Sequence, residues 1–406
     1  MIGIITIHTG YNEGAVLQSL ALSRLLAALT GEAVEVLDHR YTSALKTTEG
    51  PADTPRKQAI ADFRDSRLPL SPERFDSDHR AAWAYAARRY STVVVGSDEV
   101  WKVIYRKRVK GLFTVQDDPF APPYPNVWWP DASAGPVRIA YAVTAGARTD
   151  WTLVPRRHRA AMAEAVSGFR AIGLRDARTR AFLASFAPEI AARSVRVPDP
   201  TLAFDLLDGD TLDMRPRLEA LGVDFSRPRV AFVAGESRAA SDLAARLEAR
   251  GAQTVALSRA LSGTALDLSG APFDPLEWAA AFGAFDLVVC DRMHGCNFTL
   301  RSGRPLVMLD ERWPTFGFAT KNGELAERFG LEGFYFPVMR PETTGAALEA
   351  AACRALAGDW PFAAVRERLA VERGIALDFL TGALAKEPAA AGAHSDAAGS
   401  LSPRAH

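Results

Sequence analysis

The chain has 406 residues, of which 48% are apolar and 24% are charged, and its formal net charge is zero. This balance is ordinary for a globular enzyme and excludes the strongly basic composition of a nucleic-acid-binding domain. The length exceeds what one hydrophobic core supports comfortably, so we expect two domains.

Cysteine usage and the first residues bear on the compartment. Cys290, Cys296 and Cys353 show no CxxC spacing and are too few for a disulfide framework or a zinc cluster. The opening MIGIITIHTG lacks the features of a signal peptide, and no run approaches the ~18 apolar residues that span a bilayer. We therefore expect a cytoplasmic protein without a structural metal or a transmembrane segment.

Strand and helix signals alternate in the first half of the chain. Short β-rich runs predict strands at 2–7, 32–38, 91–96, 137–143 and 170–174. Apolar residues at helical spacing predict helices at 15–29, 158–169 and 177–186. The polar stretch 42–80 leads to a helix ending near Tyr90, and the Pro-rich, aromatic stretch 111–136 predicts an irregular excursion.

A second alternating series follows residue 208. Its strand signals lie within 227–237, 252–258, 286–290 and 304–309, and its helix signals at 239–250, 274–285 and 296–303. Such alternation predicts parallel sheets built from βαβ units. We therefore predict an α/β protein with two Rossmann-like lobes facing a cleft. The lobes span 1–205 and 206–386, and residues 387–406, which contain almost no large apolar residue, predict a disordered tail.

The sharpest signal is DRMHG at 291–295, directly after the buried-strand pattern Val288–Cys290. In open α/β sheets, ligands lie beyond the carboxyl ends of the strands. Arg292 and His294 project to the same side in extended conformation, and Gly295 permits a turn into the next helix. An anion there would meet a guanidinium, an imidazole and free helix N–H groups. The alternative is an Arg in an ion pair and a His bound to backbone.

Other strand ends offer further candidates. Arg175 in GLRD suits bidentate recognition of a carboxylate or phosphate, although a strand-end Arg beside an Asp is often structural. Asn12 and Gly14 in YNEG could open a helix N-terminus to an anion, or simply form a turn. Ser97 and Asp98 in GSDEVW either cap a helix or bind a ligand hydroxyl.

Aromatic residues follow the fourth strand signal and fill the excursion. Trp101, Trp128 and Trp129 could stack against a sugar, or pack inside the domain. The sequence has no HExxH, Walker A, GxSxG or GxGxxG motif. These absences argue against metalloprotease, P-loop, α/β-hydrolase and dinucleotide-binding chemistry.

Taken in order, these loops resemble the polysaccharide pyruvyl transferase family over nearly the whole folded chain. The resemblance rests on YNEGAVLQ, GSDEVW, YAVTAGA, GLRDARTR, VPDPTL, DRMHG and TKNGELAERFG. Thr144 stands where the family usually carries Ser, a change that could alter a ligand hydrogen bond.

The resemblance implies a two-lobed fold like that of GT-B glycosyltransferases. It also implies the reaction that the protein catalyses. The pyruvate unit of phosphoenolpyruvate would pass to sugar hydroxyls, forming a pyruvate ketal on a cell-surface polysaccharide or its precursor. Phosphoenolpyruvate is a co-substrate, and no cofactor is implied. The acceptor is a sugar or glycan, which leaves peripheral contact with a lipid-linked glycan and the oligomeric state open.

The resemblance also assigns roles to residues. His294 is the expected acid, because protonation of the enol carbon needs a group that titrates near neutrality. The expected donor-binding residues are Arg175, Arg292, Asn12, Gly14, Ser97, Thr144 and Gly295. The expected acceptor-binding residues are Asp98, Trp101, Trp128 and Trp129. A nucleotide-sugar glycosyltransferase and a non-catalytic member of glycan assembly remain as alternatives.

Overall fold

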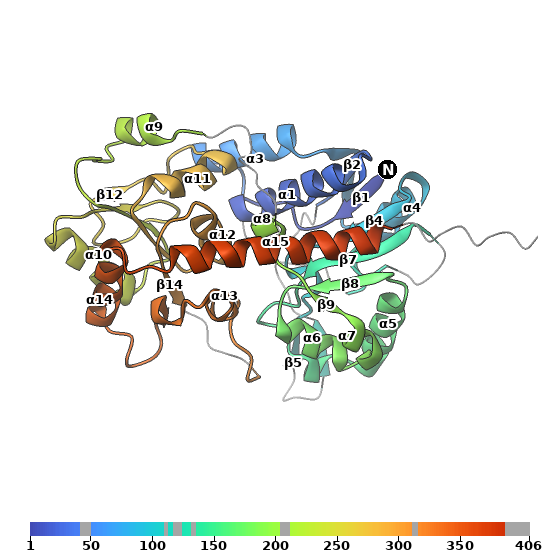
Figure 1. Cartoon of the computed structure of the whole chain (residues 1–406). Helices are drawn as coiled ribbons and strands as arrows, with labels where there is room; N and C mark the ends of the chain where they lie inside the picture. Colours follow the sequence, from blue (N-terminus) through green and yellow to red (C-terminus); the bar gives the residue numbers. More distant parts are fainter. Residues whose placement is uncertain are drawn as a thin grey trace, which may run out of the picture.

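The computed structural model describes residues 1–40, 50–108, 113–116, 124–130, 135–203, 212–310 and 316–385. It shows two lobes, each with a parallel sheet flanked by helices (Figure 1). This confirms the predicted α/β class. The boundary expected at residue 205 and the tail expected at 387–406 lie outside the described residues.

The first lobe contains a parallel sheet in the order β3-β2-β1-β4-β7-β8-β9. Its strands are β1 (Ile2–Ile5), β2 (Val34–Arg40), β3 (Leu70–Asp76), β4 (Thr92–Val95), β7 (Val137–Val143), β8 (Ala171–Leu174) and β9 (Val195–Arg196). Its helices are α1 (Glu13–Thr30), α3 (Pro55–Arg67), α4 (His79–Arg89), α5 (Arg156–Ser167), α6 (Ala177–Ala184), α7 (Pro188–Arg193) and α8 (Pro200–Ala203). Two 3-10 turns, η1 (Glu99–Trp101) and η2 (Trp151–Leu153), follow β4 and β7.

The second lobe contains a parallel sheet in the order β12-β11-β10-β13-β14-β15. Its strands are β10 (Arg229–Val233), β11 (Gln253–Ala256), β12 (Leu266–Asp267), β13 (Leu287–Cys290), β14 (Leu306–Asp310) and β15 (Tyr335–Pro337). Its helices are α9 (Arg215–Ala220), α10 (Arg238–Ala249), α11 (Pro275–Ala281), α12 (Met293–Arg301), α13 (Lys321–Phe329), α14 (Gly345–Leu356) and α15 (Phe362–Leu384). The 3-10 turns η3 (Phe282–Ala284) and η4 (Glu332–Phe334) complete it.

Both sheets reverse their winding direction at their centres. The first sheet grows from β1 to β3 on one side and continues through β4 on the other, and the second sheet does the same around β10 and β13. Such a switch point leaves a crevice at the carboxyl ends of the two central strands, where ligands bind in open α/β sheets. The motifs YNEG, GSDEVW and DRMHG follow β1, β4 and β13, so the topology places all three at switch points.

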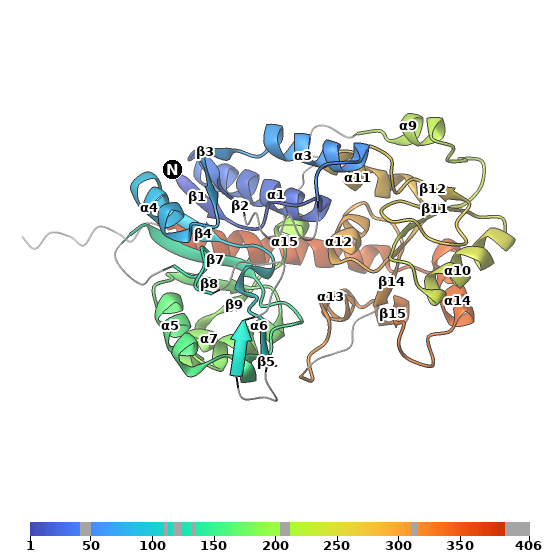
Figure 2. The same cartoon turned by 180° about the vertical axis from the view of Figure 1, so that it is seen from behind.

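Helix α1 joins the two lobes through a common core. Asn12 caps its start by accepting a hydrogen bond from the Ala15 N–H, and Gly31 ends it at φ 66°, where a left-handed conformation favours glycine. One face of α1, with Leu17 and Leu20, packs into the hydrophobic cluster that also fills the second lobe. Figures 1 and 2 both show α1 and α3 alongside α11. The lobes therefore share buried surface along one side.

The last helix returns to the first lobe. Ala376 and Leu380 of α15 lie in one cluster with Ile2 and Ile4 of β1, and Figure 1 shows α15 running across both lobes. Glu372 is fully buried at the crossing and binds a ring of guanidinium groups: Arg196 of β9, Arg328 of α13 and Arg368 of α15. The C-terminal segment thus belongs partly to the first lobe, which the sequence patterns did not indicate.

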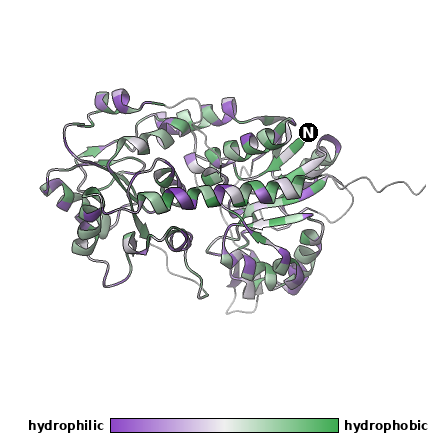
Figure 3. Cartoon of the chain, in the orientation of Figure 1, coloured by the Kyte–Doolittle hydropathy of each residue, from purple (hydrophilic) through white to green (hydrophobic). Residues whose placement is uncertain are grey.

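Hydropathy follows this layering. Figure 3 colours the central strands mostly green and the outlying helix α9 mostly purple. The polar stretch 42–80 contains α3 and β3, of which β3 is an edge strand with mostly exposed residues and so lacks the apolar signature of the inner strands. The excursion at 111–136 contributes β6 (Phe113–Gln116), which pairs antiparallel with β5 (Tyr105–Arg108). The rest of that prediction falls largely outside the described residues.

Candidate active site

A cavity of about 940 Å³ lies between the lobes. Its walls come from the segments after β1, β4 and β8 and the start of α3 on one side, and from those after β11, β13 and β14 on the other. Of the predicted site residues, it is lined by Asn12, Asp98, Arg175, Arg292, His294 and Gly295. Segments that are far apart in sequence therefore meet at the place that the strand ends predicted.

Three predicted or motif residues form one ionic network on the wall of the cavity. Asp199, in the VPDPTL segment, lies between Arg175 and His294: its Oδ2 accepts from Arg175 Nη1 at 2.8 Å and lies 3.5 Å from His294 Nε2. Thr201 donates to Oδ1 through its backbone N–H and its hydroxyl. Burial raises the pKa of Asp199, but His294, Arg175 and Thr201 together hold it well below its usual range. The Asp199 carboxylate thus lies between a guanidinium and an imidazole, buried from solvent.

Arg175 lies in the cavity wall, where protein carboxylates already bind its guanidinium. Its guanidinium is 4% exposed and binds Asp199 and Asp98, with Nη2 donating to Asp98 Oδ1 at 3.1 Å. Burial lowers the pKa of Arg175, but the neighbouring carboxylates raise it above its usual value. The side chain touches the cavity, yet its charge is already balanced by two carboxylates. It is suited to fixing Asp98 and Asp199 rather than to binding a free anion.

Gly14 and Gly295 lie where neighbouring atoms leave no room for a side chain. A Cβ on Gly14 would lie 2.3 Å from His294 Nδ1, so the first lobe's helix accepts the imidazole because this residue has no side chain. A Cβ on Gly295 would lie 2.5 Å from Cys290 Sγ. Gly295 lies inside α12 without a positive φ, so the predicted turn conformation is wrong. His294 is likewise helical, while Arg292 stands in extended conformation at the N-cap.

Replacing Gly14 with alanine is expected to disturb the contact between α1 and His294. The added methyl group overlaps His294 atoms as close to the backbone as Cβ, and such overpacking typically costs about 1–3 kcal/mol. We expect lower stability to urea and lower turnover. Gly374→Ala in α15, where a Cβ meets nothing within 4 Å, is the matched control and should not destabilise. Equal behaviour of the two variants would contradict the contact.

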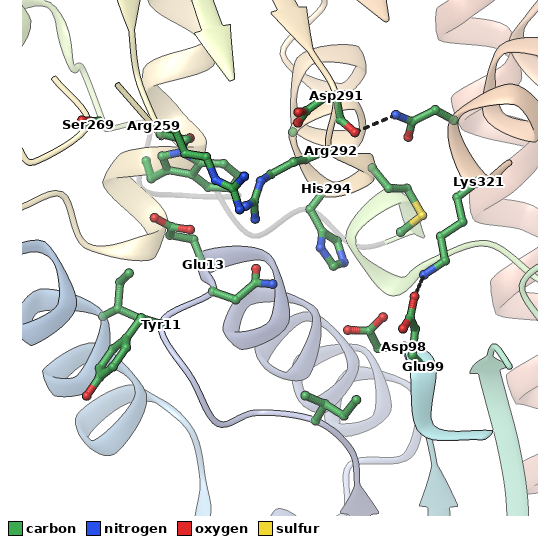
Figure 4. A pocket seen from close by; sticks show the side chains of 18 of the residues that line it. Tyr11, Glu13, Asp98, Glu99, Arg259, Ser269, Asp291, Arg292, His294 and Lys321 are labelled. Atoms are coloured by element: carbon green, nitrogen blue, oxygen red, sulfur yellow. Dashed lines mark hydrogen bonds and ion pairs between the residues drawn. The ribbon is translucent and has the colours of Figure 1, made fainter. Parts of the chain in front are cut away.

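A second charged group lies across the cavity. Glu99 accepts from Lys321 Nζ at 2.6 Å and lies 3.4 Å from Lys102 Nζ, so a helix start of the second lobe meets η1 of the first. Burial raises the pKa of Glu99, but the two lysines lower it far more. Figure 4 shows Asp98 and Glu99 side by side below His294. The sequence patterns assigned no role to Glu99 or Lys321, although both lie in quoted motifs.

Ser97 and Thr144 do not line the cavity. The Ser97 hydroxyl donates to the Gln18 amide oxygen inside the first lobe, and the Thr144 hydroxyl accepts from the Gly146 N–H and contacts Thr179. Both side chains are buried. In place of the predicted donor contacts, these hydroxyls form hydrogen bonds inside the protein, which stabilise the loops after β4 and β7.

The three tryptophans are core residues. Trp101 is 0% exposed, and Trp128 and Trp129 are 6% and 4% exposed. Trp101 and Trp129 stack at a centroid distance of 5.2 Å. Because their faces are covered by protein, the predicted stacking against a sugar is wrong for these residues, and the alternative of internal packing holds.

Arg292 and Arg259 reach into the cavity from the second lobe. Arg292 is the N-cap residue of α12 and makes no side-chain cap, while Arg259 follows β11. Figure 4 shows the two guanidinium groups pointing toward each other. Arg259 was not a predicted site residue, because a lone Arg after a strand carries no local signature.

Within the described parts of the chain, no group of three or more His, Cys, Asp or Glu side chains is arranged to hold a metal ion. A search of the same residues finds no helix with the length and apolar character needed to traverse a bilayer.

Glu324 forms a contact between the lobes whose contribution to stability should depend on pH. It accepts a hydrogen bond from the Ala177 N–H at 3.2 Å, across the cleft at the start of α6. Burial and then Asp176 raise the pKa of Glu324 to about 7, despite that hydrogen bond. The folded state therefore keeps a proton that the unfolded chain loses near pH 4.5, and stability falls as the pH rises from about 4.5 to about 7.

The substitution Glu324→Gln should remove this fall in stability with rising pH. We expect the variant to melt higher than the wild type at about pH 8 and equally at about pH 4.5, because the amide cannot ionise. Thermal melts across this range, with exposed Glu327→Gln in the same helix as control, measure the effect. Parallel curves for wild type and Glu324→Gln would contradict it.

Solved structures share the fold. The chain is similar to a putative UDP-N-acetylglucosamine 2-epimerase from Listeria monocytogenes, with a TM-score of 0.54, 13% identity and 93% of each chain covered. It is also similar to UDP-GlcNAc 2-epimerase from Neisseria meningitidis bound to UDP-GlcNAc, with a TM-score of 0.51, 7% identity, and 94% of this chain and 98% of that chain covered. The E. coli ADP-heptose lps heptosyltransferase II matches with a TM-score of 0.42 and 13% identity, over 88% of this chain and 99% of that one.

The two matches with TM-scores above 0.5 show the fold, which is GT-B-like with two Rossmann-like lobes. The curated proteins contain no significant match. The sequence profile of one family, described as polysaccharide pyruvyl transferase, matches residues 12–312. This span includes every motif placed around the cavity except the start of α13, and the chain belongs to the polysaccharide pyruvyl transferase family.

Proposed function

We propose that the protein transfers the pyruvate unit of phosphoenolpyruvate to two hydroxyls of a sugar and so forms a pyruvate ketal on a polysaccharide or its precursor. Family membership supports a transferase that modifies polysaccharides. The observation that carries the finer proposal is the ionised Asp199 against His294, in a cavity that also receives the Arg292 guanidinium.

The chemistry requires a proton at the enol methylene carbon. His294 is the group in the cavity wall that suits this step, and its Nε2 lies 3.5 Å from the Asp199 carboxylate. Protonation leaves an oxocarbenium-like centre at the neighbouring carbon. The first sugar oxygen bonds to that carbon and loses its proton, and the bond from the carbon to the phosphate oxygen breaks, with its electron pair leaving on phosphate. The second sugar hydroxyl then closes the ketal.

Asp98 and Glu99 suit the acceptor side. Both are carboxylates on the cavity wall, both come from the segment after β4, and each is held by cations of the protein. Carboxylate oxygens accept hydrogen bonds from sugar hydroxyls. We therefore place the acceptor hydroxyls beside η1.

Release of phosphate from phosphoenolpyruvate, measured against a panel of sugar diols, nucleotide sugars and lipid-linked sugars, tests the proposal. We expect release only with phosphoenolpyruvate and an acceptor together, with a ketal in the product. The competing function is a glycosyltransferase that uses a nucleotide sugar. Sugar transfer from a UDP- or GDP-sugar, with no phosphate released from phosphoenolpyruvate, would support that function instead.

A further inference from the structure

The cations that line the cavity divide into two groups. Five of the seven Arg and Lys side chains in the wall have carboxylate partners: Arg56 with Glu13, Lys57 with Asp53, Lys102 and Lys321 with Glu99, and Arg175 with Asp98 and Asp199. Arg259 and Arg292 form no ion pair with any residue that the structure describes. Carboxylates of the protein thus balance most of the cavity cations, and the charges of Arg259 and Arg292 are left available for a bound anion.

These two guanidinium groups face each other. Arg259 comes from the loop after β11 and Arg292 from the end of β13, and their side chains converge in the cavity (Figure 4). Two like charges in such an arrangement repel each other unless an anion lies between them. A planar guanidinium binds phosphate through paired N–H groups, so two of them make a strong phosphate site.

Two features of the backbone fit the same site. Gly235, after β10, lies close to Arg259: a Cβ there would lie 3.4 Å from Arg259 Nη1 and 3.5 Å from Asp291 Oδ2, the carboxylate oxygen that accepts from the Gly235 N–H. Helix α12 begins beside Arg292 without a side-chain cap, so its first N–H groups and its dipole add to the positive potential.

The opposite side of the cavity carries two carboxylates, each paired with a cation of the protein. Asp98 and Glu99 lie there, and His294 lies between them and the arginine pair (Figure 4). A donor that carries a phosphate is therefore drawn to the arginine pair, with its reacting carbon toward His294.

We infer that Arg259, together with Arg292, forms the phosphate subsite of the donor. This inference rests on the proposed function, and it names Arg259, in place of Arg175, as the partner of Arg292 in anion binding. In the reaction, the bond from the pyruvate carbon to the phosphate oxygen breaks after the enol carbon has gained its proton and the first sugar oxygen has bonded to the neighbouring carbon. The two guanidinium groups bind the leaving phosphate as it takes up the electron pair.

Calorimetric titration with phosphoenolpyruvate and with inorganic phosphate tests the inference on the full chain. Arg259→Gln should raise the dissociation constants of both ligands by about tenfold or more, because a charge-assisted contact is lost. Arg259→Lys should recover part of the affinity. Arg238→Gln is the matched control, because Arg238 is an exposed arginine of the same lobe that does not line the cavity.

The outcomes separate this inference from the proposed function. Wild-type affinity for both ligands in Arg259→Gln overturns the inference, and so does a wild-type protein that binds neither phosphate nor any nucleotide diphosphate. If wild type binds UDP but not phosphoenolpyruvate, and Arg259→Gln weakens UDP binding, the arginine pair is an anion subsite and the pyruvyl donor is wrong.

Discussion

Replacing His294 with glutamine is expected to lower kcat by a factor of about 10²–10⁴ while leaving the affinity for phosphoenolpyruvate nearly unchanged, because general acid catalysis contributes about this much. Glutamine is similar in reach and can lie beside Asp199 as the imidazole does, but it cannot deliver a proton. The Arg259–Arg292 pair that we propose for phosphate binding is untouched. Steady-state phosphate release with a working acceptor measures kcat, and calorimetry measures donor affinity.

His158→Gln is the control for this variant, because His158 bonds to the Tyr105 hydroxyl outside the cavity. It should keep wild-type turnover. Near-wild-type kcat in His294→Gln would remove the imidazole from the chemical step. A large loss of donor affinity with unchanged kcat would make His294 a binding residue.

Replacing Asp199 with asparagine should reduce both stability and activity. Asp199 is 2% exposed and shares its carboxylate between Arg175 and His294. Removing one partner of a buried ion pair typically costs about 3–5 kcal/mol, because the remaining charge stays buried. Arg175 would keep only Asp98, and His294 would lose its neighbouring carboxylate. Urea unfolding and kcat measure the two effects.

The acid dependence of stability gives a second test of Asp199. Its pKa in the folded state lies below the unfolded value, so its contribution to stability is present above the unfolded pKa, about 3.9, and is lost as the pH falls toward the folded pKa. Asp199→Asn should therefore lose stability less steeply in acid than the wild type. Asp359→Asn, an exposed carboxylate near Arg354, is the control. An unfolding free energy equal to wild type would contradict the network.

The sequence predicted the architecture through local signals. Buried β-rich runs such as Val288–Cys290 and the helical spacing that follows them survive in the structure, because each inner strand is covered on both faces. Edge strand β3 escaped prediction, because it is mostly exposed and reads as polar. The return of α15 to the first lobe and the packing of α1 into the second depend on contacts between distant segments, which periodicity does not encode.

The site was predictable where strand ends define it. Arg292, His294, Asp98 and Asn12 reach the cavity because the two switch points face each other. Asp199 was recognised only as part of the VPDPTL motif. Its role in linking Arg175 and His294 depends on contacts between residues that are distant in sequence. The tryptophans were misassigned, because an aromatic run has the same composition whether it stacks on a ligand or fills a core.

Direct titration of donors into the purified protein tests the central claim most simply, because it needs no acceptor. We predict that phosphoenolpyruvate binds saturably, that Arg292→Gln weakens this binding and that His294→Gln preserves it. Binding of a nucleotide sugar with no detectable binding of phosphoenolpyruvate would contradict the account.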